Sequence, residues 1–228
     1  MGRLAGADRE DRLTVPLWHD GPLESLPVGG DRPVVWSVRL DSDAAASALA
    51  RTPHDGRDLA DFAAAPDAAN RLLRRRLARA LLARLAGIAP EGVLFGRTAD
   101  GAPSILSPPG WYVSVAGRRP HGLIGVSTAP IGVDLEPIET APPLWDMLTA
   151  AEAAEIESVP AQERPREWLR RWTAKEAHAK KWGCARRADP VRIATGRTAS
   201  GVLRVGSDEG VSDVFQREVG GRIEAVAL

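Results

Sequence analysis

Short stretches of alternating apolar and polar residues, rich in β-branched side chains, recur in this chain and predict β-strands. In the first half of the chain these stretches are residues 33–40, 93–95, 111–115 and 123–127. In the second half they are residues 131–135, 191–193, 201–205, 212–219 and 222–228. The pattern therefore predicts short strands distributed along most of the sequence.

Apolar residues spaced by three or four positions predict helices between these strands. Four leucines recur at helical spacing over residues 68–85, and Gly87 follows as a stop signal. A short helix is predicted over residues 42–50. Two further helices are predicted over residues 144–158 and 165–182, the second with a proline in its first turn.

The order of these elements indicates two similar halves, each with a strand, then helices, then strands. The opening strands, 35–41 (Val-Trp-Ser-Val-Arg-Leu-Asp) and 130–136 (Pro-Ile-Gly-Val-Asp-Leu-Glu), resemble each other weakly. We therefore predict an α+β fold with small antiparallel sheets, packed helices and a site between the halves. The halves would span residues 32–127 and 128–228, after an irregular segment over residues 1–31 that is rich in Gly, Pro and charge.

The composition is that of an ordinary globular protein, with 44% hydrophobic residues, 26% charged residues and a net charge of zero. A neutral chain has no overall field that would draw it to nucleic acid or to a membrane. Cys184 is its one cysteine, so no internal disulfide is possible, and we expect a reducing, cytoplasmic setting. The charged N-terminus lacks the pattern of a signal peptide, and no run of about 20 apolar residues is present to span a bilayer.

Lysine is almost absent from the chain and is confined to one stretch. Only three of the 30 Lys and Arg residues are lysines, and Lys175, Lys180 and Lys181 all lie between Trp172 and Trp182. An ammonium group is a compact, strongly hydrated charge that suits a phosphate oxygen in a confined site. The retention of lysine directs the search for function to this stretch.

Two carboxylates lie close together on one predicted strand. Because side chains alternate between the faces of a strand, Asp134 and Glu136 share one face with Gly132, while three aliphatic residues occupy the other. Two interpretations are open. The strand is either half exposed with a solvated acidic face, or a cation such as Mg²⁺ lies between the two carboxylates.

A third carboxylate lies on the predicted helix near the C-terminus. Glu176 shares a helix stripe with Leu169, Trp172 and Lys180. One interpretation is an i,i+4 ion pair with Lys180, worth roughly a few tenths of a kcal/mol. The other is a third metal ligand, with lysines on either side that contact phosphate. Three carboxylates, one Mg²⁺ and nearby lysines would suit attack on a phosphoanhydride.

Two motifs at this separation resemble a known family. Residues 131–136 (Ile-Gly-Val-Asp-Leu-Glu) and 172–180 (Trp-Thr-Ala-Lys-Glu-Ala-His-Ala-Lys) are similar to the paired signature of the 4′-phosphopantetheinyl transferases of the larger, surfactin-synthetase-activating type. The likeness extends from about residue 68 to the C-terminus. Residues 68–87 are similar to the family's Arg-containing helix, 95–103 to its Gly-x-Pro segment and 223–228 to its last strand.

The resemblance implies two pseudo-symmetric halves with the site at their interface, Mg²⁺ as cofactor and coenzyme A as co-substrate. A serine of an acyl or peptidyl carrier protein, as used in polyketide or nonribosomal peptide biosynthesis, would attack the β-phosphate of coenzyme A. The serine would receive 4′-phosphopantetheine, and 3′,5′-ADP would leave. The implied Mg²⁺ ligands are Asp134, Glu136 and Glu176. The implied coenzyme A contacts are Lys175, Lys180, Arg79 and Ser114.

Within this implied site, Glu176 would also accept the serine proton, and Lys180 is counted with it as catalytic. Two halves within one chain make a monomer the expected state. Trp168, Trp172 and Trp182 are expected to pack in the core or against the carrier, and His178 is expected on the outer face of its helix.

Two positions depart from the family pattern, and both concern phosphate binding. Family members usually have a histidine that contacts the 3′-phosphate of coenzyme A, but this chain has Val115 there. The family's Gly-Lys-Pro is Gly-Ala-Pro here, so Ala102 replaces a lysine. The adjacent turn is either an ordinary surface turn or a source of replacement contacts from Arg118, Arg119 and His121.

These departures leave two classes of function open. One is the transfer reaction, and the other is a homologue with lost or altered chemistry that binds a carrier protein or its acyl thioester. The arginines between residues 71 and 84 raise nucleic-acid binding as a third. They spread around a helix without aromatic residues, which favours a solvated helix face.

Overall fold

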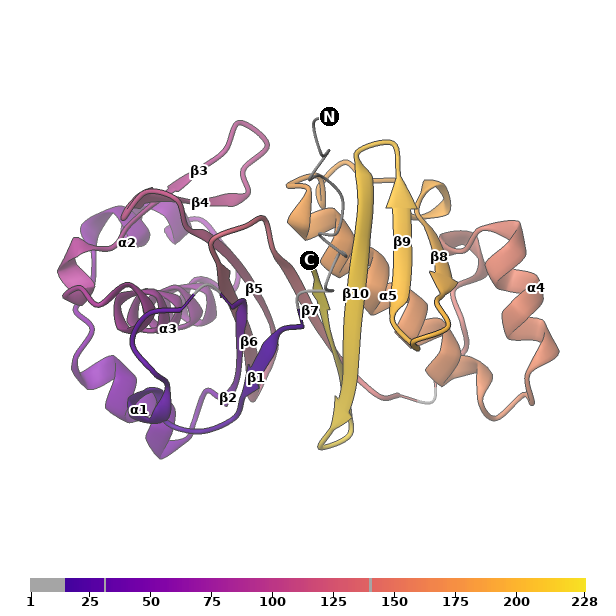
Figure 1. Ribbon diagram of the computed structural model, residues 1–228, viewed down its shortest axis with the longest axis horizontal. Helices are drawn as coiled ribbons and strands as arrows, with labels where there is room; N and C mark the ends of the chain where they lie inside the picture. The colour runs from indigo at the N-terminus through magenta and orange to yellow at the C-terminus, as the bar shows by residue number, and fades with distance from the viewer. Residues whose placement is uncertain (1–14, 31, 140) are drawn as a thin grey trace, which may run out of the picture.

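The computed structural model describes residues 15–30, 32–139 and 141–228, and shows two sheets that pack against each other (Figure 1). Helices cover the outer face of each sheet, so the molecule has four layers. The core between the sheets contains apolar residues from both halves, among them Val35, Leu123, Val133 and Val226. The predicted α+β class is confirmed.

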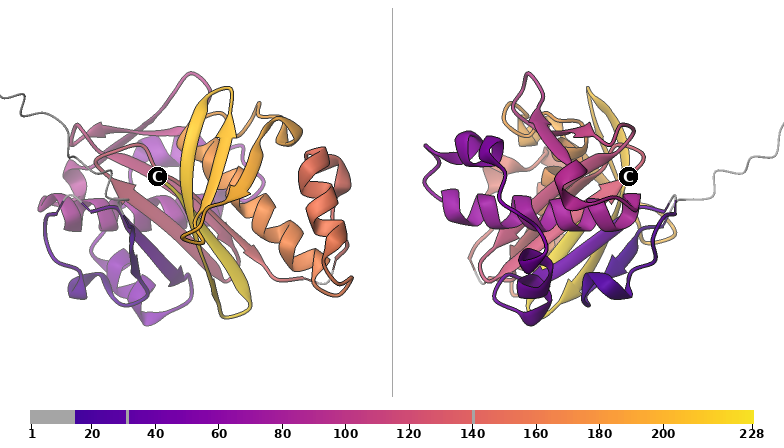
Figure 2. Two further views of the ribbon diagram at one scale, coloured as in Figure 1. Left: turned by 45° about the vertical axis from the view of Figure 1, so that its right-hand side comes forward. Right: turned by 90° about the vertical axis from the view of Figure 1, so that its left-hand side faces the viewer.

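The first half has a four-stranded sheet in the order β1-β2-β6-β5 and a separate hairpin of β3 and β4. Its strands are β1 (Leu17–His19), β2 (Val34–Arg39), β3 (Leu94–Arg97), β4 (Pro103–Ser107), β5 (Tyr112–Arg118) and β6 (His121–Ser127). Its helices are α1 (Asp43–Ala50), α2 (Gly56–Phe62) and α3 (Ala68–Ala86), with 3₁₀ turns η1 (Leu23–Ser25) and η2 (Pro90–Gly92). The long helix α3 crosses the outer face of this sheet, where its leucines enter the core (Figure 2).

The second half has a five-stranded antiparallel sheet in the order β7-β11-β10-β9-β8. Its strands are β7 (Gly132–Pro137), β8 (Ala194–Arg197), β9 (Leu203–Ser207), β10 (Gly210–Val219) and β11 (Arg222–Ala227). Its helices are α4 (Ala150–Ser158) and α5 (Arg164–Lys181), with 3₁₀ turns η3 (Trp145–Met147) and η4 (Pro190–Arg192). Alanines of α5 pack on the outer face of this sheet.

Local signals account for the ends of several helices. Gly87 ends α3 in the left-handed conformation, with φ of 66°, as its position in the sequence indicated. Ser42 caps α1 by accepting a hydrogen bond from the backbone of Ala45. The predicted helix over residues 144–158 begins later, because Thr149 and Glu152 form a capping box that starts α4 at Ala150.

Other details of the prediction were wrong. The first sheet is mixed, because β1 pairs with β2 in parallel and lies within the segment that we expected to be irregular. The rest of that expectation, over residues 1–14 and 31, falls outside the described residues. The strand predicted over residues 191–193 is largely the 3₁₀ turn η4, which Asp189 caps. The short elements α2, β4 and β8 were not predicted.

A sequence repeat in the two halves has a structural counterpart. Residues 96–101 (Gly-Arg-Thr-Ala-Asp-Gly) join β3 to β4, and residues 196–201 (Gly-Arg-Thr-Ala-Ser-Gly) join β8 to β9. In the first turn the N–H of Gly101 donates to Thr98 O at 2.9 Å, and in the second that of Gly201 donates to Thr198 O at 3.0 Å. Each half has a strand, helices, a 3₁₀ turn, a hairpin and two more strands in the same order.

Within the part of the chain that the structure describes, no helix combines the length and the apolar character needed to cross a membrane.

Candidate functional site

A glycine on β7 brings the acidic strand into direct contact with α5. A Cβ atom at Gly132 would overlap the carbonyl oxygen of Ala177, so any other residue would push the strand and the helix apart. The close contact places Asp134 and Glu136 of the strand near Glu176 of the helix, where burial raises the pKa of Glu176 and the two strand carboxylates raise it further. The three predicted carboxylates are therefore close enough to influence one another electrostatically at the interface of strand and helix.

Asp134 is the most deeply buried of the three, with 4% of its surface exposed. Its Oδ1 accepts a hydrogen bond from Lys180 Nζ at 2.6 Å, while its buried Oδ2 has no partner among the described residues. Burial raises the pKa of Asp134 despite the attraction of the lysine. Oδ2 is thus an acceptor still open to a donor or a cation.

Glu136 and Glu176 differ in their partners. Both carboxylate oxygens of Glu136 accept from Arg118, at 2.7 and 2.8 Å, and this bidentate pair raises the pKa of Arg118. Glu176 has no hydrogen bond or ion pair among the described residues. Its burial raises its pKa first, and the neighbouring charge of Asp134 raises it further. An i,i+4 ion pair between Glu176 and Lys180 does not form, because Lys180 turns to Asp134.

The donor set fits a hard divalent cation, although the carboxylates are not arranged around one. Mg²⁺ prefers carboxylate oxygens, and the mutual repulsion here would be relieved by a cation. Within the described ranges, however, no group of three or more His, Cys, Asp or Glu side chains is already gathered for a metal. Because Lys180 and Arg118 hold Asp134 and Glu136, a cation would have to compete with both.

Lys175 does not reach this site. It is 1% exposed, and its Nζ contacts Glu152 Oε2 of α4 at 2.6 Å. It also donates to the carbonyl oxygens of Met147 and Pro190, at 3.0 and 2.8 Å. Burial lowers the pKa of Lys175, and its hydrogen bond to Glu152 opposes this effect. The predicted phosphate contact is thus replaced by a buried framework ion pair.

In the first half, Arg79 of α3 likewise forms a buried ion pair and does not reach the site. It is 2% exposed, and its Nη1 donates to Asp58 Oδ2 of α2 at 2.6 Å. Its other nitrogens donate to Asp55 Oδ2 and to Val93 O, both at 3.2 Å. All three nitrogens are therefore occupied by the protein, and the structure does not bring Arg79 to the site as a coenzyme A contact.

The expected exposure of His178 was also wrong. Its side chain is fully buried, and its two ring nitrogens lie 2.9 Å from the hydroxyls of Ser207 and Ser212. Burial lowers the pKa of His178 to about 4, so the ring is neutral at ordinary pH. His178 thus fixes α5 to its sheet.

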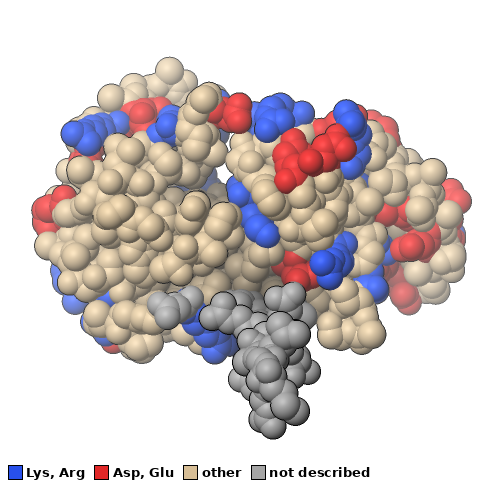
Figure 3. Space-filling view, turned by 45° about the horizontal axis from the view of Figure 1, so that its top comes forward, with Lys and Arg blue, Asp and Glu red and all other residues tan. Residues whose placement is uncertain are grey.

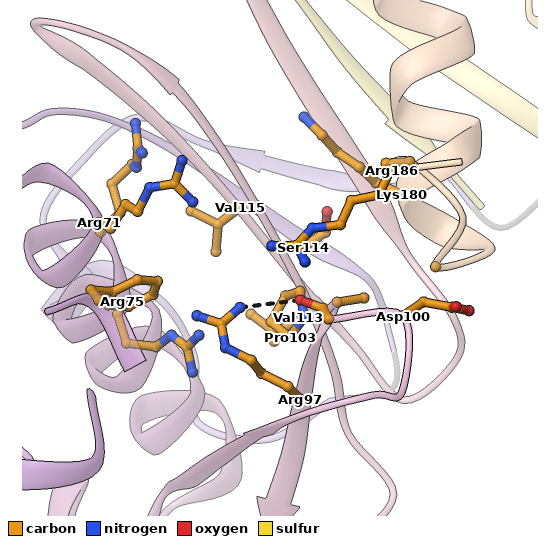
Figure 4. A pocket seen from close by; sticks show the side chains of 16 residues that line it. Arg71, Arg75, Arg97, Asp100, Pro103, Val113, Ser114, Val115, Lys180 and Arg186 are labelled. Carbon is orange, nitrogen blue, oxygen red and sulfur yellow. Dashed lines mark hydrogen bonds between the residues drawn. The ribbon is translucent and has the colours of Figure 1, made fainter. Parts of the chain in front are cut away.

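A basic cavity of about 300 Å³ lies next to the carboxylates, between the two halves (Figure 4). Basic side chains also lie at the hollow between the halves on the molecular surface (Figure 3). The basic side chains that line the cavity are those of Arg71, Arg74, Arg75, Arg97, Lys180 and Arg186. One carboxylate, Asp100, lines it among the described residues. The cavity is therefore suited to an anion, and Lys180 connects it to the acidic group.

The two positions that depart from the family pattern both line this cavity, as does Ser114. The Oγ of Ser114 accepts a hydrogen bond from the backbone N–H of Val133 at 3.0 Å, so it also joins β5 to β7. Ala102 and Val115 contribute apolar surface where a lysine and a histidine were expected. The cavity keeps its basic character because arginines surround these two positions.

The turn that we considered as a source of replacement cations does not line the cavity. Arg118 is bound to Glu136, Arg119 donates to Asn70, and His121 is half buried. The cavity arginines come instead from α3, β3 and the segment after α5. Three of them follow helical spacing at positions 71, 74 and 75, which could have indicated a shared face. The spread of all the arginines around this helix favours a solvated face instead, so the sequence pattern did not separate these three.

A larger groove of about 580 Å³ lies on another side of Glu136 and Arg118. It is lined by Trp168 and Trp172, whose parallel rings have centroids 6.1 Å apart. The exposed side chain of Leu144 also lines it. The tryptophans thus pack on each other beside an open apolar surface near the carboxylates.

One comparison with known proteins concerns the half that contains these carboxylates. Residues 130–220 match the model of the 4′-phosphopantetheinyl transferase superfamily, and this range includes β7 and α5. A Synechocystis sp. protein named "Putative 4'-phosphopantetheinyl transferase slr0495" is 34% identical over 129 residues, which cover 52% of this chain and 51% of that protein. The chain therefore spans about half the length of this curated relative.

Proposed function

We propose that this chain, which belongs to the 4′-phosphopantetheinyl transferase superfamily through its residues 130–220, transfers 4′-phosphopantetheine from coenzyme A to a serine of a carrier protein. The observation that carries this proposal is the position of Asp134, Glu136 and Glu176 beside a basic cavity between the halves. The resemblance of the two motifs to the surfactin-synthetase-activating type supports the same reaction and the same class of partner, an acyl or peptidyl carrier protein.

In this proposal the three carboxylates hold Mg²⁺, which would neutralise phosphate charge when bound. The unpartnered Oδ2 of Asp134 and the unpaired carboxylate of Glu176 support this assignment. Lys180 Nζ lies at the junction of the carboxylates and the basic cavity, 2.6 Å from Asp134 Oδ1. From there it can turn to a phosphate oxygen of coenzyme A.

Glu176 has the properties expected of the proton acceptor. Its raised pKa makes it a stronger base than an ordinary glutamate, and no described side chain occupies its oxygens. The serine oxygen would form a bond to the β-phosphorus of coenzyme A, while the bond from that phosphorus to the bridging oxygen breaks. The serine proton would pass to Glu176, and 3′,5′-ADP would leave with the bridging oxygen.

The test is incubation with Mg²⁺, coenzyme A and a panel of apo carrier proteins, followed by mass spectrometry of the carriers. We expect the mass of one phosphopantetheine to be added to at least one carrier. Glu176→Gln should abolish this addition, whereas Glu157→Gln, the same change on the exposed face of α4, should not. A folded protein that modifies no carrier in the panel would contradict the proposal.

A second candidate function is a homologue with lost or altered chemistry that still binds a carrier protein or its acyl thioester. The observations that favour it are the apolar Ala102 and Val115, and the engagement of two carboxylates by Lys180 and Arg118. Carrier binding that is unchanged by Glu176→Gln, with no transfer by the wild type, would support this candidate.

A further inference from the structure

A buried carboxylate joins the two halves of the molecule. Glu224 of β11 is fully buried, and it faces the core between the sheets, because its register partner Leu135 packs there. Glu224 Oε1 accepts a hydrogen bond from the hydroxyl of Ser37 at 2.5 Å. Ser37 is also buried and lies on β2, so the first half binds a carboxylate of the second half directly.

Two arginines of the second half complete the binding of this carboxylate. Arg222 Nε donates to Glu224 Oε1, and Arg217 Nε donates to Glu224 Oε2, both at 2.8 Å. Arg222 Nη2 also donates to the hydroxyl of Ser37, at 3.1 Å. Both oxygens of Glu224 therefore accept from charged donors, which form the stronger kind of hydrogen bond.

Arg217 extends the network to a second point in the first half. Its Nη1 donates to Asp20 Oδ2 at 2.8 Å, and its guanidinium carbon lies 4.4 Å from the centre of the Trp18 ring on β1. Two carboxylates thus balance two guanidinium groups. We call this set the interface network, and its members are Asp20, Ser37, Arg217, Arg222 and Glu224.

The rest of the core between the sheets is apolar and fixes their relative position less tightly. Its buried members are Val35, Ala116, Leu123, Ile131, Val133, Leu135 and Val226. Apolar contacts are non-directional, whereas hydrogen bonds require one geometry. A shift of one sheet over the other would break the bonds at both points where the interface network crosses between the halves.

In the second sheet, strand register connects the interface network to the acidic strand. The residues on either side of Glu224 on β11 pair with Asp134 and Glu136 of β7. Because side chains alternate, Glu224 faces the first half, while Asp134 and Glu136 project from the opposite face of the sheet. A movement of Glu224 relative to the first half would therefore move both carboxylates with it.

In the first sheet, register connects the network to a strand that lines the basic cavity. Ser37 pairs with Leu123 of β6, and Leu123 pairs with Ala116 of β5. The two residues before Ala116 on β5 line the cavity. Because hydrogen-bonded strands move together, the bond from Ser37 to Glu224 holds this strand in place relative to the acidic strand.

We infer that the interface network is a lock that holds the two halves in the arrangement that forms the candidate site. Glu224 is then a positioning residue, which acts on the site through β7 and contacts no substrate. The positioning role rests on the proposed function, in which one ligand contacts both halves. The lock itself does not depend on that function.

One backbone amide reports directly on the contact between the halves. β7 is an edge strand of its sheet, and the N–H of Val133 donates to Ser114 Oγ of the first half at 3.0 Å. This N–H exchanges with solvent when β7 separates from β5. The amides between β10 and β11 exchange when the second sheet itself opens, so they serve as an internal reference.

The experiment is hydrogen exchange of the full chain, followed by NMR without ligand or metal, for the wild type and for Asp20→Ala/Ser37→Ala. This double variant removes both crossing points and leaves Glu224 with its two arginines, so no buried charge is unpaired. We expect the Val133 amide to exchange about tenfold faster or more, as the loss of a hydrogen bond to a charged group would produce. The amides between β10 and β11 should change little.

Two further variants control for the change of charge. Asp41→Ala removes an exposed carboxylate whose partner, Arg39, lies in the same half, and it should leave the exchange of Val133 unchanged. Asp20→Glu keeps the carboxylate and should retain most of the protection that Asp20→Ala loses. Glu224→Gln is not the primary variant, because buried guanidinium groups would lose their anion and the whole fold would be destabilised.

Two results would overturn the lock. One is an unchanged exchange rate of the Val133 amide in the double variant. The other is an equal acceleration at Val133 and in the amides between β10 and β11, because this shows a loss of overall stability and no separation of the halves.

A second measurement tests the positioning role and separates it from the proposed function. Saturating coenzyme A should slow the exchange of Val133 in the double variant, because a ligand that contacts both halves favours their locked arrangement. If calorimetry shows binding and the exchange does not change, the positioning role is wrong. If coenzyme A does not bind to the wild type, the proposed function is contradicted, and the exchange without ligand still decides the lock.

Discussion

The long helices α3 and α5 occupy corresponding places in the two halves, and both carry a buried cation. Arg79 of α3 pairs with Asp58 of α2, and Lys175 of α5 pairs with Glu152 of α4, each at 2.6 Å. Each cation also donates to a backbone carbonyl at or beside the following 3₁₀ turn, Val93 O after η2 and Pro190 O in η4. The halves therefore share a framework in which a buried ion pair fixes the long helix to the helix before it.

The two halves differ where they meet. In the second half, β7 and α5 present carboxylates to the interface, whereas the corresponding strand β2 ends in the exposed pair of Arg39 and Asp41, at 2.9 Å. In the first half, α3 presents Arg75 to the same interface. The comparison shows that one half supplies acidic groups and the other mainly basic groups, on a common framework. A site for a cation and for a polyanion thus needs both halves.

The largest expected effect comes from Glu176→Gln, which removes the proposed proton acceptor and leaves the buried ion pairs of both halves in place. If Glu176 accepts the serine proton, transfer should fall by about 10²–10⁴-fold in a carrier-modification assay. Because the folded protein raises the pKa of Glu176, its ionised form is unfavourable, so the amide should unfold at the same or a higher temperature. A variant that loses activity together with stability would mean that Glu176 belongs to the framework.

The next largest effect should come from the buried ion pairs, and should be similar in both halves. Lys175→Met and Arg79→Met each remove the nearest cation of a buried carboxylate, which costs about 3–5 kcal/mol in the free energy of unfolding. Urea denaturation would measure the loss. The double variant Lys175→Met/Glu152→Leu should recover part of it, because no unpaired charge remains, although the N–H groups of Thr149 and Thr195 lose their acceptor.

This prediction separates Lys175 from a phosphate-binding role. A substrate contact would reduce affinity for coenzyme A with little change in stability, and the double variant would not restore that affinity. A loss of stability in only one of the two single variants would show that the framework is not shared between the halves.

The contrast between Lys175 and Glu176 also shows which parts of the candidate site could be predicted from the sequence. Helical spacing placed Glu176 and Lys180 on the face toward the acidic strand, and strand alternation placed Asp134 and Glu136 there. These are local arguments, and the α+β fold and most element positions followed from similar ones. Lys175 is one residue from Glu176, but its partner Glu152 comes from another helix, so no local pattern could reveal it.

The basic cavity was missed for a related reason. Arg75 and Arg97 are separated in sequence and meet only after the β3–β4 hairpin packs beside α3, while Arg186 comes from the other half. The motifs identify a lysine and a histidine that are absent from this chain, but they carry no information about arginines that other elements bring to the same cavity. The repeated turn at residues 96–101 and 196–201 was visible in the sequence and would have strengthened the argument for two similar halves.

A smaller effect should appear in the pH dependence of stability, with opposite signs for two glutamates of the second half. Burial raises the pKa of Glu176, so between its ordinary pKa and its folded pKa the folded state binds more protons than the unfolded state. Stability from this group therefore rises as pH falls through that window. The difference in unfolding free energy between Glu176→Gln and the wild type should shrink as pH is lowered toward about 4.

Glu152 should behave in the opposite way. Burial acts to raise its pKa, but hydrogen bonds from Lys175 and Thr195 outweigh this effect and leave the pKa lowered. Its contribution to stability is present above its ordinary pKa and is lost as pH falls through the folded value. The quantity to compare is the signed difference in unfolding free energy, variant minus wild type, from urea titrations of Glu152→Gln and Glu176→Gln between pH 7 and about pH 3. As pH falls, it should rise for Glu152→Gln and fall for Glu176→Gln, and a change in the same direction for both would contradict the assignment.

The smallest effect concerns the repeated hairpin, where equivalent glycines have different surroundings. A Cβ atom on Gly96 would lie 3.0 Å from a side-chain carbon of Leu106, whereas one on Gly196 would meet nothing within 4 Å. Neither glycine has the positive φ that would strain an alanine. Gly196→Ala should therefore raise the free energy of unfolding by about 0.4–1 kcal/mol, through the lower entropy of the unfolded chain. Gly96→Ala should gain less, because Leu106 has to move. If thermal unfolding showed an equal gain at both positions, the two hairpins would be equally open, and the asymmetry of the halves would be confined to the interface.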